Sequence, residues 1–451
     1  MINFYDMAYG LGVGVAAPVW MLKRSARQKV LSAFAQRMGQ VTPRVSQGAA
    51  VMIHAVSLGE MNATRGLVTR LRELRPDLHL IISATTDTGF ARAQELYGKP
   101  GTGSAGMTII RYPLDFTGAV CRVLDRLRPS AVVLMELEVW PNFLRQCAKR
   151  DIPVVLVNGR MTEPSYRRYR WIRPVVRGMF RKMAALCVQD QVNADRFATL
   201  GASRDRMHVT GTMKFDTATV AEHVAGDEEL SQAVGLRVGE EPIWVCGSTG
   251  PGEEQIVLEE YRRLLTQYPT LRLAIIPRHP QRFEEVAVLI QGMGFALVRR
   301  SQHGSALSTQ HSALRPVVLG DTMGELRKFY SLGTVVFVGR TLVDLGPRQH
   351  GSDMIEPAAL GKPVIVGRFT GNFADAMGRF RAGGAMIEVS SGQELGEAVA
   401  KLLGNAEEAR AMGRAGQVVV VNEKGATERH VGVILEQIGG NRQQFSVTAL
   451  N

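Results

Sequence analysis

Apolar and polar residues alternate in blocks from Ala50 onward. Short runs rich in Val, Ile and Leu are separated by amphipathic segments, for example residues 63–74 and 118–127, that have helical spacing. The apolar runs show little period-two alternation, which is typical of parallel strands covered on both faces. Seven strands are predicted in the first half, at residues 50–55, 78–83, 108–112, 131–135, 154–158, 186–188 and 208–210.

The pattern changes after Asp216. Residues 217–241 are polar and acidic and are expected to form a linker that carries a helix. The alternation then restarts and predicts seven more strands, at residues 243–246, 271–276, 296–299, 316–319, 334–338, 364–366 and 385–389. Two doubly wound α/β domains are therefore expected, at residues 31–216 and 242–451. A ligand shared by both is expected in a cleft between them, beyond the carboxyl ends of the strands.

The N-terminal region, residues 1–30, has a different character. Residues 7–22 carry no charge, and four basic residues follow between positions 23 and 29. This run is shorter than the roughly 20 residues that span a bilayer, and its charges follow the apolar stretch instead of preceding it, which disfavours a cleaved signal peptide. A membrane-anchor helix with its basic flank in the cytoplasm is the favoured interpretation, and a helix buried in the protein is the alternative.

Composition narrows the class of protein. Hydrophobic content of 45% and charged content of 21% are ordinary for a globular chain. The four cysteines are scattered, which disfavours a disulfide framework or a zinc cluster. The net charge is +12, and residues 145–182 hold 11 Lys or Arg against only Asp151 and Glu163. Such a patch attracts the phosphates of lipid or nucleic acid, but no nucleic-acid-binding motif accompanies it; a solvated basic face is the alternative.

Two segments of the first half carry candidate chemistry. Glu60 lies after the first predicted strand, at the start of a helix, where a carboxylate is either a helix cap or a general base that faces a ligand. Glu136 and Glu138 follow a buried strand, and this spacing points to the mouth of the expected cleft. Hydrogen bonding to neighbouring loop amides would explain these two residues equally well.

The second half offers groups suited to phosphate. The loop Gly247-Ser248-Thr249 precedes a helix whose N-terminal N–H groups could cradle an anion. Arg278 and His279 stand between two prolines at the end of a strand, and arginine suits bidentate phosphate contacts. No metal-ligand spacing is present, so we expect a metal-independent reaction without a cofactor, in which cations and helix dipoles stabilise a leaving phosphate.

Further segments complete this set. Residues 320–326 join a strand to a helix, and residues 353–363 place an acid before a short helix that ends in Gly-Lys-Pro. In order along the chain, the segments resemble the bacterial 3-deoxy-D-manno-octulosonic acid (Kdo) transferases of lipopolysaccharide assembly. The segments that carry the resemblance are His54-Ala-Val-Ser-Leu-Gly-Glu60, Glu136-Leu-Glu-Val-Trp-Pro-Asn142, Asn158-Gly-Arg160, Gly211-Thr-Met-Lys-Phe-Asp216, Gly247-Ser-Thr249, Pro277-Arg-His-Pro280, Gly320-Asp-Thr-Met-Gly-Glu325, Glu356-Pro-Ala-Ala-Leu-Gly-Lys-Pro363 and Asn372-Phe373.

The resemblance implies a GT-B fold of two Rossmann-like domains, the first for the acceptor and the second for the sugar nucleotide. It also implies CMP-Kdo as donor, a lipid A precursor as acceptor, and a membrane-associated enzyme of the inner leaflet. Glu60 would be the base, and Glu138 and Lys214 would support the transition state. The residues expected to bind the CMP-sugar are Gly247, Ser248, Thr249, Pro277, Arg278, Met323, Gly324, Glu325, Asp353, Met354, Ile355 and Glu356.

One segment departs from the family pattern. Where the family usually has His-Asn-Pro-Leu, this chain has Ser352-Asp-Met-Ile355, and His350 lies two residues too early to substitute. Asp353 adds negative charge near an anionic sugar. The alternatives are another GT-B enzyme, such as a UDP-sugar lipid glycosyltransferase or a nucleotide-sugar epimerase, and a non-catalytic membrane-bound sensor of sugar nucleotides.

Overall fold

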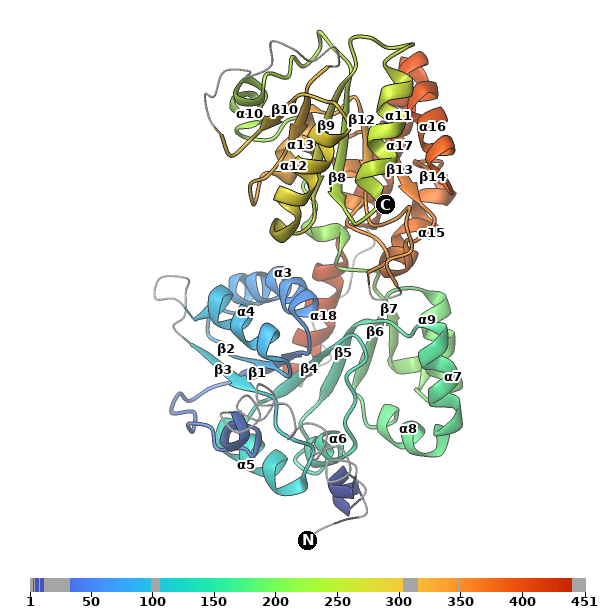
Figure 1. Ribbon diagram of the computed structural model, residues 1–451. Helices are drawn as coiled ribbons and strands as arrows, with labels where there is room; N and C mark the ends of the chain where they lie inside the picture. Colours follow the sequence, from blue (N-terminus) through green and yellow to red (C-terminus); the bar gives the residue numbers. More distant parts are fainter. Residues whose placement is uncertain are drawn as a thin grey trace. The chain divides into compact units, whose positions relative to one another are not determined.

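The structure is a computed structural model that describes residues 3, 5–7, 9–11, 33–98, 106–302, 315–346 and 349–439. The chain divides into two compact units. The first unit contains Met1–Asp216 and Lys424–Asn451, and the second contains Thr217–Glu423 (Figure 1).

The first unit is built on a seven-stranded parallel sheet with the order β3-β2-β1-β4-β5-β6-β7. Its strands are β1 (Ala50–Ala55), β2 (His79–Ala84), β3 (Met107–Arg111), β4 (Ala131–Met135), β5 (Val154–Gly159), β6 (Ala185–Val188) and β7 (Met207–Val209). Its helices are α3 (Leu58–Leu74), α4 (Asp87–Tyr97), α5 (Thr117–Leu127), α6 (Pro141–Ala148), α7 (Glu163–Trp171), α8 (Arg173–Phe180), α9 (Gln191–Thr199) and α18 (Ala426–Gly439).

Strand β1 explains why the apolar runs lack alternation. Every residue of β1 is buried. Ala50 and Met52 belong to the core on one face of the sheet, and Val51 and Ile53 belong to the core on the other. Because successive side chains of a strand point to opposite faces, a strand with two covered faces must be apolar throughout.

Helix α18 corrects the expected domain boundary. Residues 242–451 were expected to form one domain, but α18 packs against α3, β4, β5 and β6 of the first unit (Figure 1). Its side chains Val431, Val433 and Ile434 are buried in the same core as β1. Burial of each such side chain contributes about 1.5–3 kcal/mol, and the chain must return to the first sheet to obtain it.

The second unit contains another seven-stranded parallel sheet, with the order β10-β11-β9-β8-β12-β13-β14. Its strands are β8 (Ile243–Thr249), β9 (Arg272–Pro277), β10 (Leu297–Arg299), β11 (Val317–Leu319), β12 (Val335–Val338), β13 (Val364–Gly367) and β14 (Met386–Val389). Its helices are α10 (Asp227–Val234), α11 (Glu253–Leu264), α12 (Phe283–Gly292), α13 (Leu326–Leu332), α14 (Ile355–Ala359), α15 (Ala374–Ala382), α16 (Gly392–Gly404) and α17 (Ala406–Glu423).

Residues 217–241, expected as a linker, are part of this second unit. They carry α10, and the hydroxyl of Ser331 donates to the carboxylate of the buried Asp227 at 2.8 Å. Glu241 forms a buried ion pair with Arg272, at the start of β9, at 3.0 Å. Asp227 and Glu241 of this segment therefore contact a helix and a strand of the second unit.

The fold class expected from the sequence is confirmed as two parallel-sheet α/β units. Each of the fourteen predicted strands has a counterpart, and the largest difference is at β8, which runs three residues past its predicted end at residue 246, to Thr249. The expected anchor falls largely on residues 12–32, which lie outside the described residues. Among the residues that are described, no helix is long and apolar enough to cross a membrane.

Candidate active site

The carboxyl ends of β1 and β4 form the topological switch point of the first sheet. β1 pairs with β2 on one side and with β4 on the other, so the strand order reverses between them. Open parallel sheets bind ligands at such points. Glu60 follows β1, and Glu136 and Glu138 follow β4, so three carboxylates from two neighbouring strands collect at this position.

Glu60 is held by the turn that starts α3. The backbone N–H of Val56 donates to Glu60 Oε2 at 2.9 Å, and the Ser57 hydroxyl donates to Oε1 at 2.9 Å. The Ser57 oxygen in turn accepts from the Glu60 N–H at 3.3 Å, in the reciprocal manner of a capping box. Glu60 therefore caps the helix, as one of the two expected roles requires, and its carboxylate also lies at the switch point of the sheet.

The pKa of Glu60 is raised to about 7. Burial is the largest cause; the hydrogen bond from Val56 opposes it, and repulsion from Glu136 and Glu138 adds to it. A carboxylate that titrates near neutral pH can accept a proton during a reaction and release it afterwards. The site is therefore suited to a general base.

The two acids after β4 are held differently. Glu136 has a φ of 55°, in the left-handed region that non-glycine residues rarely adopt, and its N–H donates to the Val157 carbonyl at 2.9 Å. Glu138 accepts a hydrogen bond from the Trp140 indole at 3.1 Å. Burial raises the pKa of Glu138, the Trp140 bond opposes this, and the Glu136 charge adds to it. Strained backbone of this kind occurs most often at functional sites.

Lys214 lies further along the same edge of the sheet. It follows β7, and the strands β4, β5 and β6 separate β7 from β1. The adjacent Met213 N–H donates to the side-chain oxygen of Asn158, at the end of β5, at 3.4 Å. Asp216 accepts from the Gly425 N–H at 2.7 Å and so caps α18. The segment 211–216 thus turns back over the sheet, but no hydrogen bond or ion pair of the described residues joins Lys214 directly to Glu60 or Glu138.

The second sheet has its own switch point, between β8 and β12. Gly247, Ser248 and Thr249 form the end of β8, where the pairing with β9 shifts register. A Cβ on Gly247 would collide with the Tyr330 ring, so only glycine fits there. Ser248 has a φ of 57°, and its carbonyl accepts from the Ser352 hydroxyl at 3.4 Å. Residues 352–355, which depart from the family pattern, are therefore hydrogen-bonded to the loop of residues 247–249.

A buried carboxylate fixes the loop after β12. Glu253, in the first turn of α11, accepts four backbone hydrogen bonds, from Gly250 at 2.8 Å, Arg340 at 2.6 Å, Thr341 at 2.9 Å and Leu342 at 2.9 Å. Four donors satisfy a carboxylate that is fully buried, which would otherwise be very costly. Glu253 is therefore a structural group that orients Arg340.

Arg340 is a candidate site residue that the sequence analysis missed. Its φ is 59°, and its Nε is buried without a hydrogen-bond partner among the described residues. Burial lowers the pKa of Arg340, and the neighbouring charge of Arg278 lowers it further. Arg278 is exposed, and its guanidinium has no ion-pair partner in the described part of the chain. Two neighbouring guanidinium groups of this kind are suited to holding an anion. The only sequence signal was an arginine directly after Gly339 at the end of a buried strand.

Among the other residues expected to contact the nucleotide, Met323 and Gly324 are exposed, whereas Glu325 is held by bonds within the protein. Met323 is 70% exposed, and Gly324 has a φ of 87°. The carboxylate of Glu325 makes two bonds to Arg300, at 2.9 and 3.0 Å, and accepts from Thr322. Burial alone would raise the pKa of Glu325, but the bonds from Arg300 and Thr322 outweigh it and the pKa lies below its usual value.

The segment before β13 contributes one free carboxylate. Met354 and Ile355 are fully buried, so their side chains serve the core and only their backbone groups can meet a ligand. Asp353 accepts from the Ile355 N–H at 2.9 Å and starts α14. Glu356 is half-buried and makes no hydrogen bond or ion pair within the described residues. Burial, followed by repulsion from Asp353, raises the pKa of Glu356 to about 7. Its carboxylate is available to accept hydrogen bonds from ligand hydroxyl groups.

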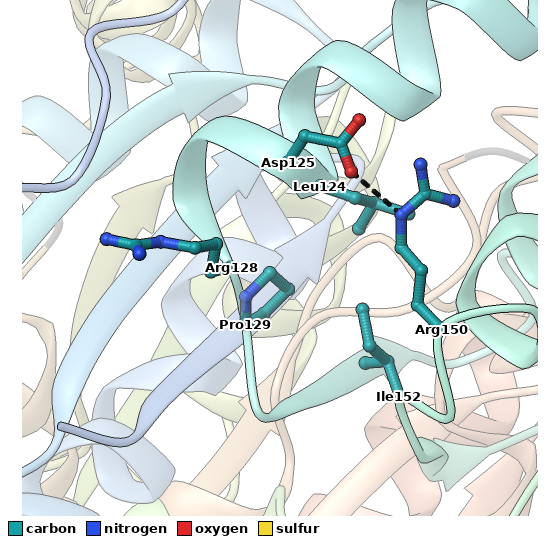
Figure 2. Close-up of a pocket in the computed structure, with 6 residues that line it drawn as sticks. All are labelled: Leu124, Asp125, Arg128, Pro129, Arg150 and Ile152. Carbon is teal, nitrogen blue, oxygen red and sulfur yellow. Dashed lines mark hydrogen bonds and ion pairs between the residues drawn. The ribbon is translucent and has the colours of Figure 1, made fainter.

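A separate cavity of about 360 Å³ lies on the first unit away from these residues (Figure 2). Arg128 and Pro129 precede β4, and Ile152 precedes β5, so the cavity is at the amino ends of the strands. Figure 2 shows Arg150 paired with Asp125 across it, at 2.9 Å. None of the expected site residues lines this cavity, and its one acidic residue, Asp125, already forms an ion pair with Arg150.

Comparisons with known proteins show what the chain as a whole is similar to. Residues 32–217 match the family described as 3-Deoxy-D-manno-octulosonic-acid transferase (kdotransferase). The chain is 34% identical over 385 residues to a 3-deoxy-D-manno-octulosonic acid transferase of Haemophilus influenzae, covering 84% of this chain and 85% of the relative. It is 33% identical to the enzyme of that name from Bordetella pertussis, covering 96% and 99%. A solved glycosyltransferase from Rickettsia africae, 12% identical, shares the fold with a TM-score of 0.56 over 88% of this chain and 100% of the other.

Proposed function

Because this chain belongs to the 3-deoxy-D-manno-octulosonic acid transferases, a group of glycosyltransferases, we propose that it transfers Kdo from CMP-Kdo to a hydroxyl of a lipid A precursor, with Glu60 as general base. The observation that carries the proposal is the Glu60 carboxylate, which lies at a sheet switch point and whose pKa is raised to about 7.

The reaction is a direct displacement at the anomeric carbon of Kdo. The acceptor oxygen forms a bond to this carbon as the bond to the CMP phosphate oxygen breaks. The acceptor proton passes to Glu60, and the electron pair leaves with CMP. Glu138, and Lys214 further along the edge, would support the charge that develops during transfer.

The second unit supplies groups for the donor. CMP-Kdo carries a phosphodiester and a carboxylate, and the unpaired Arg278 with the neighbouring Arg340 offers two guanidinium groups for these anions. The first N–H groups of α11 add a favourable dipole near the Gly247–Thr249 loop. The free carboxylate of Glu356 suits the ribose hydroxyls. Met323 and Gly324 provide exposed surface near the same strand ends, whereas the side chain of Pro277, at the end of β9, is buried.

The acceptor and the location rest on different features. A lipid A precursor is a phosphorylated lipid, which agrees with the basic stretch of residues 145–182. The uncharged run of residues 7–22 supports attachment to the cytoplasmic face of the bacterial inner membrane. We expect deletion of residues 1–24 to move the protein from the membrane fraction to the supernatant without loss of its circular dichroism spectrum; continued sedimentation with membranes would contradict the anchor.

The decisive experiment is mass spectrometry of the product. The purified full-length chain is incubated with a tetra-acylated lipid A precursor and either CMP-Kdo or UDP-N-acetylglucosamine. A mass increase by one or more Kdo units, seen only with CMP-Kdo, supports the proposal. Transfer from the UDP-sugar, or donor binding without any product, would favour the other enzyme class or a sensor and overturn it.

A further inference from the structure

Five arginines line one cavity of about 570 Å³ on the first unit. Arg173 and Arg177 lie on α8, Arg181 follows its end, and Arg204 and Arg206 lie in the short helix Arg204–Arg206 that precedes β7. Among the residues that the structure describes, no acidic side chain lines the cavity. It is at the amino ends of β6 and β7, the opposite edge of the sheet from Glu60 and Lys214.

Most of this positive charge is not used by the fold. Arg204 pairs with Asp195 at 2.9 Å, and Arg206 donates to the carbonyls of Arg181 and Met183. The guanidinium groups of Arg173, Arg177 and Arg181, by contrast, have no hydrogen-bond or ion-pair partner in the described part of the chain.

The spacing of these three arginines places their like charges close together on α8. They recur every four residues along α8 and its C-terminal end, so each lies over the next on one side of the helix. Like charges at this spacing destabilise a helix. A bound anion would remove that repulsion, and guanidinium groups match the oxygens of a phosphate in a bidentate manner.

The opposite wall of the cavity, which contains Gly201, lies close to these arginines. Gly201 lies beside the side-chain stem of Arg177, has a φ of 105°, and has no room for a Cβ. A side chain at this position would push Arg177 away. The loop after α9 therefore narrows the basic face into a cavity.

Exposed apolar side chains stand directly before and among these arginines. Trp171 is 89% exposed, Ile172 is 50% exposed and Val175 is 37% exposed, at the junction of α7 and α8. Exposed tryptophan beside basic residues is typical of protein segments that lie at a lipid–water interface. A soluble phosphate would make no use of these apolar groups.

We propose that the five-arginine cavity binds the phosphate of a lipid headgroup and so docks the α7–α8 face on an anionic membrane surface. This deepens the membrane association in the proposed function, and it assigns that contact to a defined cavity at the edge of the sheet away from the reacting carboxylates. The test measures binding, not turnover, so its result does not depend on whether the chain transfers Kdo.

The experiment measures the affinity of the full-length chain for two kinds of vesicle. One contains phosphatidylcholine alone, and the other contains phosphatidylcholine and phosphatidylglycerol at 3:1. The ratio of the two affinities measures the contribution of the anionic headgroup, because any apolar insertion by the N-terminal residues contributes equally to binding of both kinds of vesicle. The variant is the double substitution Arg177→Ala with Arg181→Ala. The matched control is Arg410→Ala with Arg414→Ala, which removes two exposed arginines at the same spacing from α17.

We expect the ratio to fall at least about tenfold in the cavity variant, because each basic side chain near an anionic surface contributes roughly fivefold. The control should keep the wild-type ratio within about twofold. Equal losses in both variants would show that net charge alone acts, and an unchanged ratio in the cavity variant would exclude the site; either result overturns the proposal.

Two further arms complete the test. Arg177→Lys with Arg181→Lys keeps the charge but removes the guanidinium fork, so it tests the cavity even where the alanine variant folds poorly. A loss of about threefold or more in the ratio supports headgroup recognition, and no loss contradicts it.

Titration with inorganic phosphate identifies the source of the ligand. Phosphate binding that the alanine variant abolishes, together with an unchanged vesicle ratio, would assign the cavity to free phosphate and overturn the lipid assignment.

Discussion

The imidazole of His430 in the C-terminal helix α18 accepts a hydrogen bond from the backbone N–H of Asn158, at the end of β5, at 2.8 Å. The two residues are 272 positions apart in the chain. The other ring nitrogen, Nδ1, lies 2.5 Å from the Ala426 carbonyl and donates to it, so the buried ring is neutral with its proton on Nδ1. Asn158 in turn holds the segment that carries Lys214, through the Met213 N–H. Helix α18 thereby supports the strand ends of the first unit.

Replacing His430 by alanine should destabilise the first unit. The substitution leaves the Asn158 N–H without its acceptor and opens a cavity in the core, so we expect the free energy of unfolding to fall by about 2–4 kcal/mol. Urea denaturation followed by circular dichroism measures this change. Glu436→Gln, at an exposed position of the same helix, should change stability by less than about 0.5 kcal/mol. Equal stability of the His430→Ala variant and the wild type would contradict the buried hydrogen bond.

The two buried histidines should each destabilise the fold as the pH falls, while carboxylates with a raised pKa, such as Glu60 and Glu356, act in the opposite direction. Burial lowers the pKa of His430 to about 4 and that of His54 to about 3, against 6.5 for the free side chain. Between pH 6.5 and 4 these two histidines bind protons in the unfolded chain but not in the folded chain, so their contribution to stability is full above pH 6.5 and falls as the pH decreases. Each group contributes a slope of about 1.4 kcal/mol per pH unit within this window. The slope should be smaller in His430→Asn, and an identical slope would show that this residue does not titrate on unfolding.

Glu60→Gln should lower turnover by about 10²-fold or more, because the amide cannot accept the acceptor proton. Donor affinity should barely change. Glu73→Gln, near the exposed end of the same helix, is the matched control and should retain the wild-type rate. Full activity of the Glu60 variant would remove this residue from the role of base.

The pH dependence of turnover tests the same assignment independently. The base must be deprotonated to act, and burial raises the pKa of Glu60 to about 7. Turnover should therefore rise with pH through a limb centred near 7 and level off above it. A flat rate between pH 5 and 8 would indicate that no group with this pKa takes part.

Arg278→Ala and Arg340→Ala should each weaken binding of CMP by about tenfold or more, because each removes a guanidinium from the anion site of the second unit. Arg381→Ala, which breaks an exposed ion pair with Glu388, should leave CMP affinity unchanged. Calorimetric titration measures all three. Unchanged affinity in Arg340→Ala would show that its partly buried guanidinium has a purely structural role.

Gly247→Ala should destabilise the second unit by about 1–3 kcal/mol, because its Cβ would overlap the ring of Tyr330. Gly292→Ala is the matched control, since nothing lies within 4 Å of a Cβ at that helical position. There the substitution should be neutral or stabilise by up to about 1 kcal/mol. Thermal unfolding compares the two, and equal melting temperatures would contradict the close packing of β8 on α13.

The candidate site was only partly predictable from the sequence. Glu60, Glu138 and Arg278 could be singled out because each lies just after a recognisable apolar strand, where a parallel sheet presents its ligand-binding edge. Arg340 could not, because its importance depends on Glu253, a residue 87 positions earlier whose carboxylate holds the Arg340 N–H. Met354 and Ile355 were expected as donor contacts, but nothing in the local sequence distinguishes a ligand contact from a core position, and the structure buries both side chains.

The sequence by itself determined the number and positions of the strands and the division into two α/β units. It could do so because the apolar runs and helical spacing are properties of residues close together in the chain. Only the tertiary structure decided that α18 joins the first sheet, that Arg278 and Arg340 are neighbours, and that arginines from α8 and from the turn before β7 share one cavity. These contacts join residues far apart in sequence, and their selection depends on which surfaces can be buried together, which local patterns do not encode.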